Sequence, residues 1–149
     1  MLFTTRTYIT KIYVMLEKDL WKLVKNNISG HKTRIENAVS PGFPDCFCAW
    51  SNRYCLLELK IIRYHTLRIQ KSQLVFFHEG IRHGARIRIL AYSKNLIHLF
   101  TAKNIIKTKH SAISCDKISY RINELKGYTW ASPYNWNDIS DKIYRMEEY

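Results

Sequence analysis

The chain has 149 residues, of which 46% are hydrophobic, 13% aromatic and 24% charged. This composition is typical of a chain that folds around a core, and it excludes a disordered, collagen-like or coiled-coil protein. No run of about 18 uncharged apolar residues occurs, so we expect no membrane-spanning segment. The 24 Lys and Arg exceed the 12 Asp and Glu, and the net charge of +12 favours a nucleic-acid partner over an anionic membrane surface.

The positive charge gathers in the middle of the chain, where residues 53–110 carry twelve Lys and Arg against two acidic residues. The four cysteines are Cys46, Cys48, Cys55 and Cys115, and their spacing lacks the second pair that a structural zinc site requires. We therefore expect buried free thiols, as in a reducing, cytoplasmic compartment.

Hydrophobic periodicity and turn residues predict an ordered set of elements for the first two thirds of the chain. They are a helix over 9–25, a short strand over 33–39, a turn over 40–44, strands over 45–50 and 54–62, a helix over 69–83, and strands over 86–92 and 96–100. The order α-β-β-β-α-β indicates an α/β fold with a mixed central sheet.

The last third of the chain has a less regular pattern. A short basic helix is expected over 101–109, residues 115–126 fit a helix or a strand equally, residues 128–136 resemble a loop, and residues 138–148 favour a helix. We expect residues 1–149 to form a single domain with its core over about 9–100, and residues 101–149 to form an extension that packs on or flanks the core.

Two charged residues interrupt the apolar strand that follows Cys55. Leu57, Leu59 and Ile61 share one face of this strand, while Glu58 and Lys60 lie on the other face, about 7 Å apart. Charged groups inside an apolar strand are costly unless they are paired or functional. The pattern therefore indicates either a functional pair or a solvated salt bridge on an edge strand.

Further carboxylates could join Glu58. Asp45 opens the preceding strand after a Pro-rich turn, and a hairpin would bring it beside Glu58, where two carboxylates form an oxygen site for a hard divalent cation. Asp45 could equally be a simple turn residue. Glu17, on the face of the first helix expected to pack on the sheet, and Glu36, on the first short strand, are alternative sources of a third carboxylate.

The start of the second helix is a candidate phosphate site. Gln73 shares a helix face with Phe76 and Phe77, and Arg68 and Lys71 lie near the helix N-terminus. Backbone N–H groups and basic side chains at such a terminus bind anions.

Taken together, Pro44-Asp45, Glu58-Leu59-Lys60 and a helix carrying Gln73 resemble the motifs of the PD-(D/E)XK nuclease superfamily. The similarity is greatest to small VRR-NUC-type and phage-encoded members, and it covers residues 9–100. Glu17 matches the acidic residue of the first helix of this family. The resemblance implies a restriction-endonuclease-like core, with a mixed central sheet flanked by helices.

The resemblance also implies a metal-dependent phosphodiesterase. Mg²⁺, for which Mn²⁺ would substitute, would be held by Asp45, Glu58 and the Leu59 carbonyl, with Glu17 or Glu36 completing the shell. Lys60 would orient the attacking water, and Gln73 would position the phosphate or the nucleophile. The residues expected to bind flanking DNA phosphates are Arg68, Lys71, Arg82, Arg86 and Arg88.

We therefore expect an intracellular DNA endonuclease, which resembles structure-specific Holliday-junction resolvases that act as homodimers. A symmetric junction requires two paired cuts, which a twofold dimer would supply. The alternatives are a less specific viral or mobile-element nuclease for replication or host-DNA breakdown, and a non-catalytic basic DNA-binding protein. No membrane association is expected.

Overall fold

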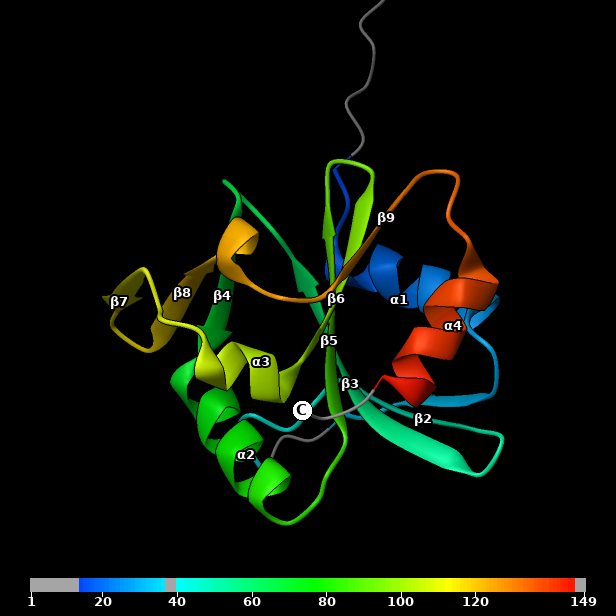
Figure 1. Cartoon of the computed structure of the whole chain (residues 1–149), viewed down its shortest axis with the longest axis horizontal. Coiled ribbons are helices and arrows are strands. Elements are labelled where there is room, and N and C mark those ends of the chain that lie inside the picture. The colour runs from blue at the N-terminus through cyan, green and yellow to red at the C-terminus, as the bar shows by residue number, and fades with distance from the viewer. Residues whose placement is uncertain (1–13, 37–39, 147–149) are drawn as a thin grey trace, which may run out of the picture.

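The computed structural model describes residues 14–36 and 40–146, which form two sheets and their covering helices (Figure 1). The elements in chain order are α1 (Glu17–Asn27), β1 (His31–Arg34), β2 (Cys46–Trp50), β3 (Arg53–Ile61), β4 (Thr66–Gln70), α2 (Lys71–Arg82), β5 (Ile87–Ser93), β6 (Leu96–Thr101), α3 (Ala102–Lys107), β7 (Ala112–Ser114), β8 (Lys117–Arg121), a 3-10 turn η1 (Ile122–Glu124), β9 (Tyr128–Ala131) and α4 (Trp136–Arg145). Within these residues, no helix combines the length and apolar character needed to span a bilayer.

The larger sheet has six strands in the order β1-β2-β3-β5-β6-β9. Strands β3 and β5 are parallel, and every other neighbouring pair in this sheet is antiparallel. A parallel pair needs a crossover, which the β4–α2 segment provides. The predicted α/β fold with a mixed sheet flanked by helices is confirmed.

Two hydrophobic cores lie on opposite faces of this sheet, with α1 and α4 on one face and α2 and α3 on the other (Figure 1). In the first core, Leu20 and Val24 of α1 are one helical turn apart and are fully buried. In the second core, Phe77 of α2 packs among the apolar side chains of β5 and β6. Both faces of the central strands are therefore covered.

Helix α1 begins later than the predicted helix over 9–25. Leu16 is extended, and its backbone N–H donates to the Asp19 carboxylate (2.9 Å), which caps the helix at this point. Residues 9–13 lie outside the described part of the chain. Strand β1 covers 31–34 rather than 33–39, and residues 37–39 also lie outside the described part.

The segment 66–70 is a strand rather than the start of the second helix, and it joins a smaller antiparallel sheet in the order β4-β8-β7. The ambiguous segment 115–126 supplies strand β8 of this sheet and the turn η1. The loop expected over 128–136 contains β9, which extends the larger sheet beside β6. The last third of the chain thus contributes strands to both sheets.

The cysteine prediction is correct for three residues. Cys46, Cys48 and Cys55 are free and fully buried in the core beneath α1 and α4. Cys115 is also free but is exposed, because it lies in the turn between β7 and β8.

Candidate active site

The register of the β2–β3 hairpin brings the two predicted carboxylates together. Cys46 pairs with Leu57, so Asp45, one residue earlier, lies next to Glu58. Glu58 and Lys60 face α2, whereas Leu57 and Leu59 on the opposite face belong to the core beneath α1 and α4. The alternation expected from the sequence is therefore present.

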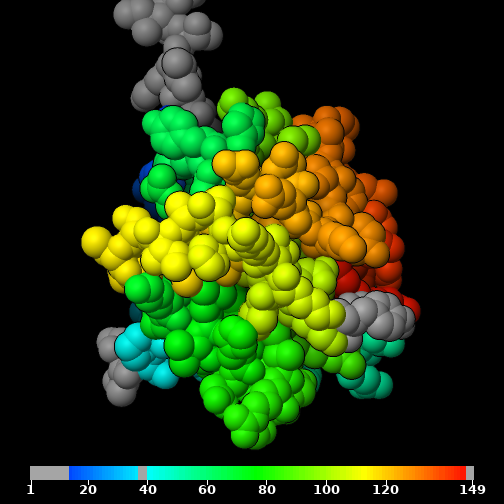
Figure 2. Space-filling model, turned by 60° about the vertical axis from the view of Figure 1, so that its left-hand side comes forward, coloured from blue at the N-terminus to red at the C-terminus, as the bar shows by residue number. Residues whose placement is uncertain are grey.

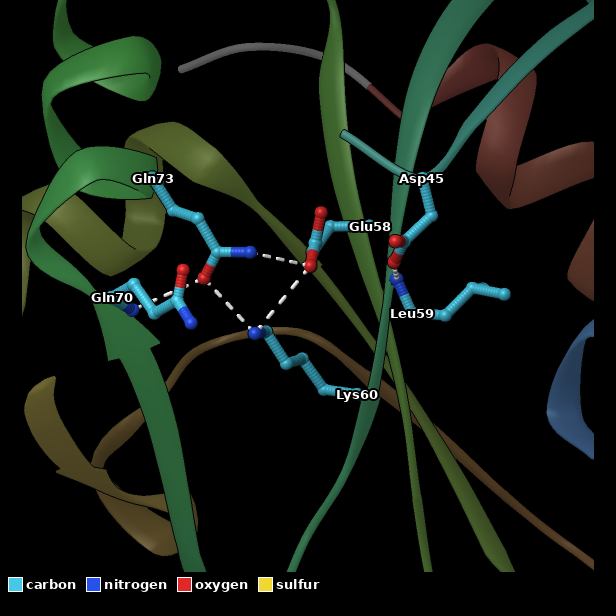
Figure 3. Close-up of polar contacts among 6 residues, drawn as sticks. All are labelled: Asp45, Glu58, Leu59, Lys60, Gln70 and Gln73. Atoms are coloured by element: carbon cyan, nitrogen blue, oxygen red, sulfur yellow. Dashed lines mark hydrogen bonds and ion pairs between the residues drawn. The ribbon is translucent and has the colours of Figure 1, made fainter. Parts of the chain in front are cut away.

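Asp45 is fixed from both sides. Its Oδ2 accepts a hydrogen bond from the Leu59 backbone N–H at 2.8 Å (Figure 3). The turn before it rests on the first turn of α2, because a Cβ on Gly42 (φ +86°) would lie 2.3 Å from the carbonyl oxygen of Ser72. Phe43 contacts Phe76 of α2 edge-to-face, with 5.0 Å between the ring centroids.

Gln73 connects the charged residues of β3 to helix α2 (Figure 3). Its amide nitrogen donates to Glu58 Oε1 at 2.6 Å, and its Oε1 accepts from Lys60 Nζ at 2.9 Å. The Gln70 backbone N–H also donates to this oxygen, at 3.1 Å, which fixes the orientation of the amide. Lys60 Nζ lies 3.4 Å from Glu58 Oε1, so the four groups form one network.

Glu58 is in an electrostatically unfavourable position for a carboxylate. Its side chain is only 3% exposed, and burial, followed by the negative charge of Asp45, raises its pKa to about 8, although Lys60 opposes this shift. Its second oxygen, Oε2, is buried without a hydrogen-bond partner among the described residues. A buried, unpaired carboxylate oxygen beside a second carboxylate is what a divalent cation would satisfy.

Glu17 lies near this network, but not as expected. It is an exposed residue at the first position of α1, so the prediction that it lies on the packed helix face is wrong. Partial burial and the charge of Asp45 raise the pKa of its carboxyl, while Lys60 and Arg34 oppose this shift. Its charge also raises the Glu58 pKa, which indicates that Glu17 belongs to the same electrostatic site.

Glu36 is exposed, two residues beyond the end of β1. Within the described ranges, no three His, Cys, Asp or Glu side chains are arranged to hold a metal ion. The candidate cation site therefore rests on two neighbouring carboxylates, Asp45 and Glu58, and on the unpartnered Oε2 of Glu58. The choice between Glu17 and Glu36 for a third ligand, and a ligand role for the Leu59 carbonyl, stay predictions.

The predicted DNA-binding residues separate into two groups. Arg68 and Lys71 are exposed at the junction of β4 and α2, close to Gln73. Arg82 is exposed at the other end of α2, where it lies 3.8 Å from Glu79, and the half-buried Arg86 follows it. For these four residues, DNA contact stays a prediction.

The prediction that Arg88 binds a DNA phosphate is wrong, because its side chain is fully buried. Its Nε donates to the Ile143 carbonyl at 3.1 Å, and an NH2 donates to the Met146 carbonyl. Arg88 therefore caps the C-terminal carbonyls of α4 and does not face a DNA backbone.

Sequence reasoning missed five of the eight residues that line the pocket beside this network. This pocket, of about 250 Å³, is lined by Glu17, Lys60, Ile61, Arg63, Thr66, Arg68, Gln70 and Lys117. The polar–apolar alternation of residues 66–70 could have identified β4 and hence Gln70. No pattern in the neighbouring sequence identifies Arg63 or Lys117 as a site residue. Lys117 reaches the pocket only because β8 pairs with β4, which places Lys117 opposite Gln70.

The mixed sheet with helices on both faces defines a restriction-endonuclease-like fold. The structure is similar to that of Hjc, a Holliday junction resolvase from the archaeal hyperthermophile Archaeoglobus fulgidus, with a TM-score of 0.50 and 17% sequence identity. The match covers 73% of this chain and 88% of the resolvase. No protein-family model and no curated protein sequence matches the chain.

Proposed function

We propose that this protein is a metal-dependent endodeoxyribonuclease that hydrolyses phosphodiester bonds at the site formed by Asp45, Glu58, Lys60 and Gln73. The observation that carries the proposal is the buried, unpartnered Glu58 Oε2 beside Asp45. A purely structural ion pair would satisfy that oxygen, because leaving it bare costs free energy.

Asp45 and Glu58 would hold Mg²⁺ or Mn²⁺, with the Leu59 carbonyl and Glu17 as further oxygen donors and Glu36 as the alternative to Glu17. When bound, the cation would withdraw charge from the scissile phosphate and lower the pKa of a water molecule. The donors are all oxygens, as a hard cation requires.

Hydrogen bonds fix the positions of the other two residues, Gln73 and Lys60. Gln73 holds Glu58 Oε1, which leaves Oε2 as the free oxygen of that carboxylate. The same amide holds the Lys60 ammonium, which would orient the attacking water and stabilise the negative charge that develops on the phosphate oxygens. Gln73 is thus a positioning residue, which would place the phosphate or the nucleophile through Glu58 and Lys60.

DNA is the proposed substrate, because the net charge of +12 favours a polyanion and the fold is that of a DNA resolvase. We further propose structure-specific cleavage of a four-way junction by a homodimer, since paired cuts in a symmetric junction require two sites related by a twofold axis. The whole chain would act as one nuclease domain in the cytoplasm of a cell, or as a virus-encoded enzyme there.

The decisive experiment compares a four-way junction, a linear duplex and a single strand at equal concentration, with Mg²⁺, Mn²⁺ or EDTA. We expect paired cuts in the junction that require the metal and are absent from a Lys60→Ala preparation. Equal cleavage of all three substrates would instead support a nonspecific viral or mobile-element nuclease. Binding without cleavage under every metal condition would contradict the enzymatic proposal and leave a DNA-binding protein.

A further inference from the structure

The smaller sheet has two chemically different faces. Leu67 and Ile69 of β4 and Tyr120 of β8 point inward and belong to the core beneath α2 and α3. The alternate positions point outward, and the outward set on these two strands is Thr66, Arg68, Gln70, Lys117, Ser119 and Arg121. On β4 and β8 this outward face contains only polar and basic residues, and β7 adds Ala112 and Ser114.

Three positive charges lie close together on the outward face. Arg68 pairs with Ser119, so Lys117 and Arg121 are its diagonal neighbours on β8, at about 7–8 Å between backbones. None of the three forms a salt bridge with another described residue, whereas Arg82, Lys142 and Arg145 each do. No salt bridge among the described residues offsets their mutual repulsion, and a polyanion would neutralise it.

The outward face is continuous with the candidate active site. Arg68, Gln70 and Lys117 line the pocket of about 250 Å³ that Glu17 and Lys60 also line. In Figure 2 the yellow segment before and within the β7–β8 hairpin crosses the surface directly above the green helix α2. A strand bound on this face would therefore lead directly into the network around Lys60.

The opposite end of the face carries an unusual turn between β3 and β4. Tyr64 (φ +56°) and His65 (φ +58°) both adopt the left-handed conformation, which bulky residues rarely do. The Tyr64 side chain is 88% exposed and borders a hollow of about 470 Å³ that Thr66 and Arg121 of the outward face also border. The strained turn thus presents an aromatic ring to solvent beside the basic residues.

We propose that the outward face of the β4–β8–β7 sheet binds the DNA backbone on one side of the scissile phosphate, and that Tyr64 stacks on a base at the far end. Five residues of β4 span about 17 Å, which matches the rise of about five base pairs. Aromatic stacking is independent of base sequence and therefore suits a structure-selective protein. The placement of this contact relative to the scissile phosphate rests on the proposed nuclease function, whereas DNA binding by this face does not.

The first test measures DNA affinity in EDTA, where no cleavage is needed. The variant Lys117→Gln/Arg121→Gln removes two charges from the face. The matched control, Lys22→Gln/Lys25→Gln, removes two exposed charges from α1, which covers the opposite face of the larger sheet (Figure 1). We expect the slope of log affinity against log salt to fall by about 1.8 in the first variant only. Equal slopes in both variants would overturn the proposal.

Cys115 offers a direct positional test, because it is the only exposed one of the four cysteines and lies in the β7–β8 turn. DNA that carries a tether ending in a mixed disulfide on one phosphate should exchange with the Cys115 thiol, releasing the small thiol, only when the tether lies within a few nucleotides on one side of the cut. Cross-linking that is independent of tether position would contradict the proposed path. A wild-type protein that cross-links but never cleaves would contradict the nuclease proposal alone.

Tyr64 is tested with two variants that separate the ring from the turn. Asn accepts a positive φ more readily than Tyr, so Tyr64→Asn should melt at or above the wild-type temperature while DNA affinity falls about tenfold. Tyr64→Phe keeps the ring and should bind within about twofold of wild type. Equal affinity of all three proteins would overturn the stacking contact.

Discussion

Alternate residues of strand β3 point to opposite faces of the sheet, and the two faces have different roles: one packs in the core, and the other carries the charged residues of the candidate site. Leu57 and Leu59 are buried under α1 and α4 among apolar neighbours, whereas Glu58 and Lys60 meet α2 through hydrogen bonds. One face gains free energy from burial, and the other holds a buried carboxylate with an unsatisfied oxygen. A single strand can therefore stabilise the fold through one face and hold the candidate catalytic residues on the other.

The largest effect is expected on the polar face. Lys60→Ala or Asp45→Asn should reduce Mg²⁺-dependent cleavage by about a thousandfold or more, because each removes a charge placed at the proposed reacting phosphate. DNA affinity should change little, since binding depends mainly on the basic surface. Single-turnover cleavage and equilibrium binding measure the two effects. Mg²⁺-dependent cleavage retained in both variants would refute the assigned site.

The apolar face should respond in stability instead. Leu57→Ala removes a fully buried side chain and should lower the free energy of unfolding by about 2–5 kcal/mol. Leu57→Met, which nearly conserves volume, should cost less than about 1.5 kcal/mol. Urea unfolding measures both variants. The comparison of the two faces fails if folded Leu57→Ala protein loses cleavage as severely as Lys60→Ala.

Glu58 should reduce stability in the absence of metal. Because its pKa is raised to about 8 from an ordinary value of 4.5, the folded state binds more protons between these values, and wild-type stability falls as the pH rises through this window. Glu58→Gln cannot ionise, so it should be more stable than wild type by up to a few kcal/mol above pH 8.

Urea unfolding in EDTA at pH 5 and pH 9 tests this expectation. The gain of Glu58→Gln should be small at pH 5 and larger at pH 9. Adding Mg²⁺ should then stabilise the wild type more than the variant, because the variant lacks the carboxylate that binds the cation. A gain that is equal at both pH values would show that ionisation of Glu58 is not its cause.

The smallest effect concerns the third carboxylate. Glu17→Gln should raise the Mg²⁺ concentration needed for half-maximal cleavage by about three- to tenfold, with partial rescue by Mn²⁺, because its charge acts on Glu58. Glu36→Gln should leave the metal requirement unchanged. Metal titrations of both variants decide between them, and the reverse outcome would assign the role to Glu36.

The sequence predicted the features that depend on short-range pattern. The alternation in β3 identified which side chains share a face, and the hairpin spacing correctly placed Asp45 beside Glu58. Gln73 was found because a polar residue on an apolar helix face is conspicuous. Each of these signals lies within one element or one turn.

Two of the features that the sequence did not predict depend on distant segments of the chain, and a third depends on a local contact. Arg88 was predicted to bind DNA at the surface, but the C-terminal end of α4 covers it, and its side chain binds the carbonyls there. Lys117 reaches the pocket only because β8 pairs with β4. Helix α1 starts at Glu17 because Asp19 caps Leu16, a local contact that competes with hydrophobic periodicity.

Gly42 has a consequence for how salt experiments are interpreted. The turn that carries Asp45 abuts the backbone of Ser72 so closely that even one extra carbon would collide with it. Such a steric contact, unlike an ion pair, does not weaken as ionic strength rises. The alignment of Asp45 with Gln73 should therefore persist in concentrated salt. If cleavage stops in concentrated salt, the cause is dissociation of the DNA, and tethering the DNA to the protein should restore cleavage.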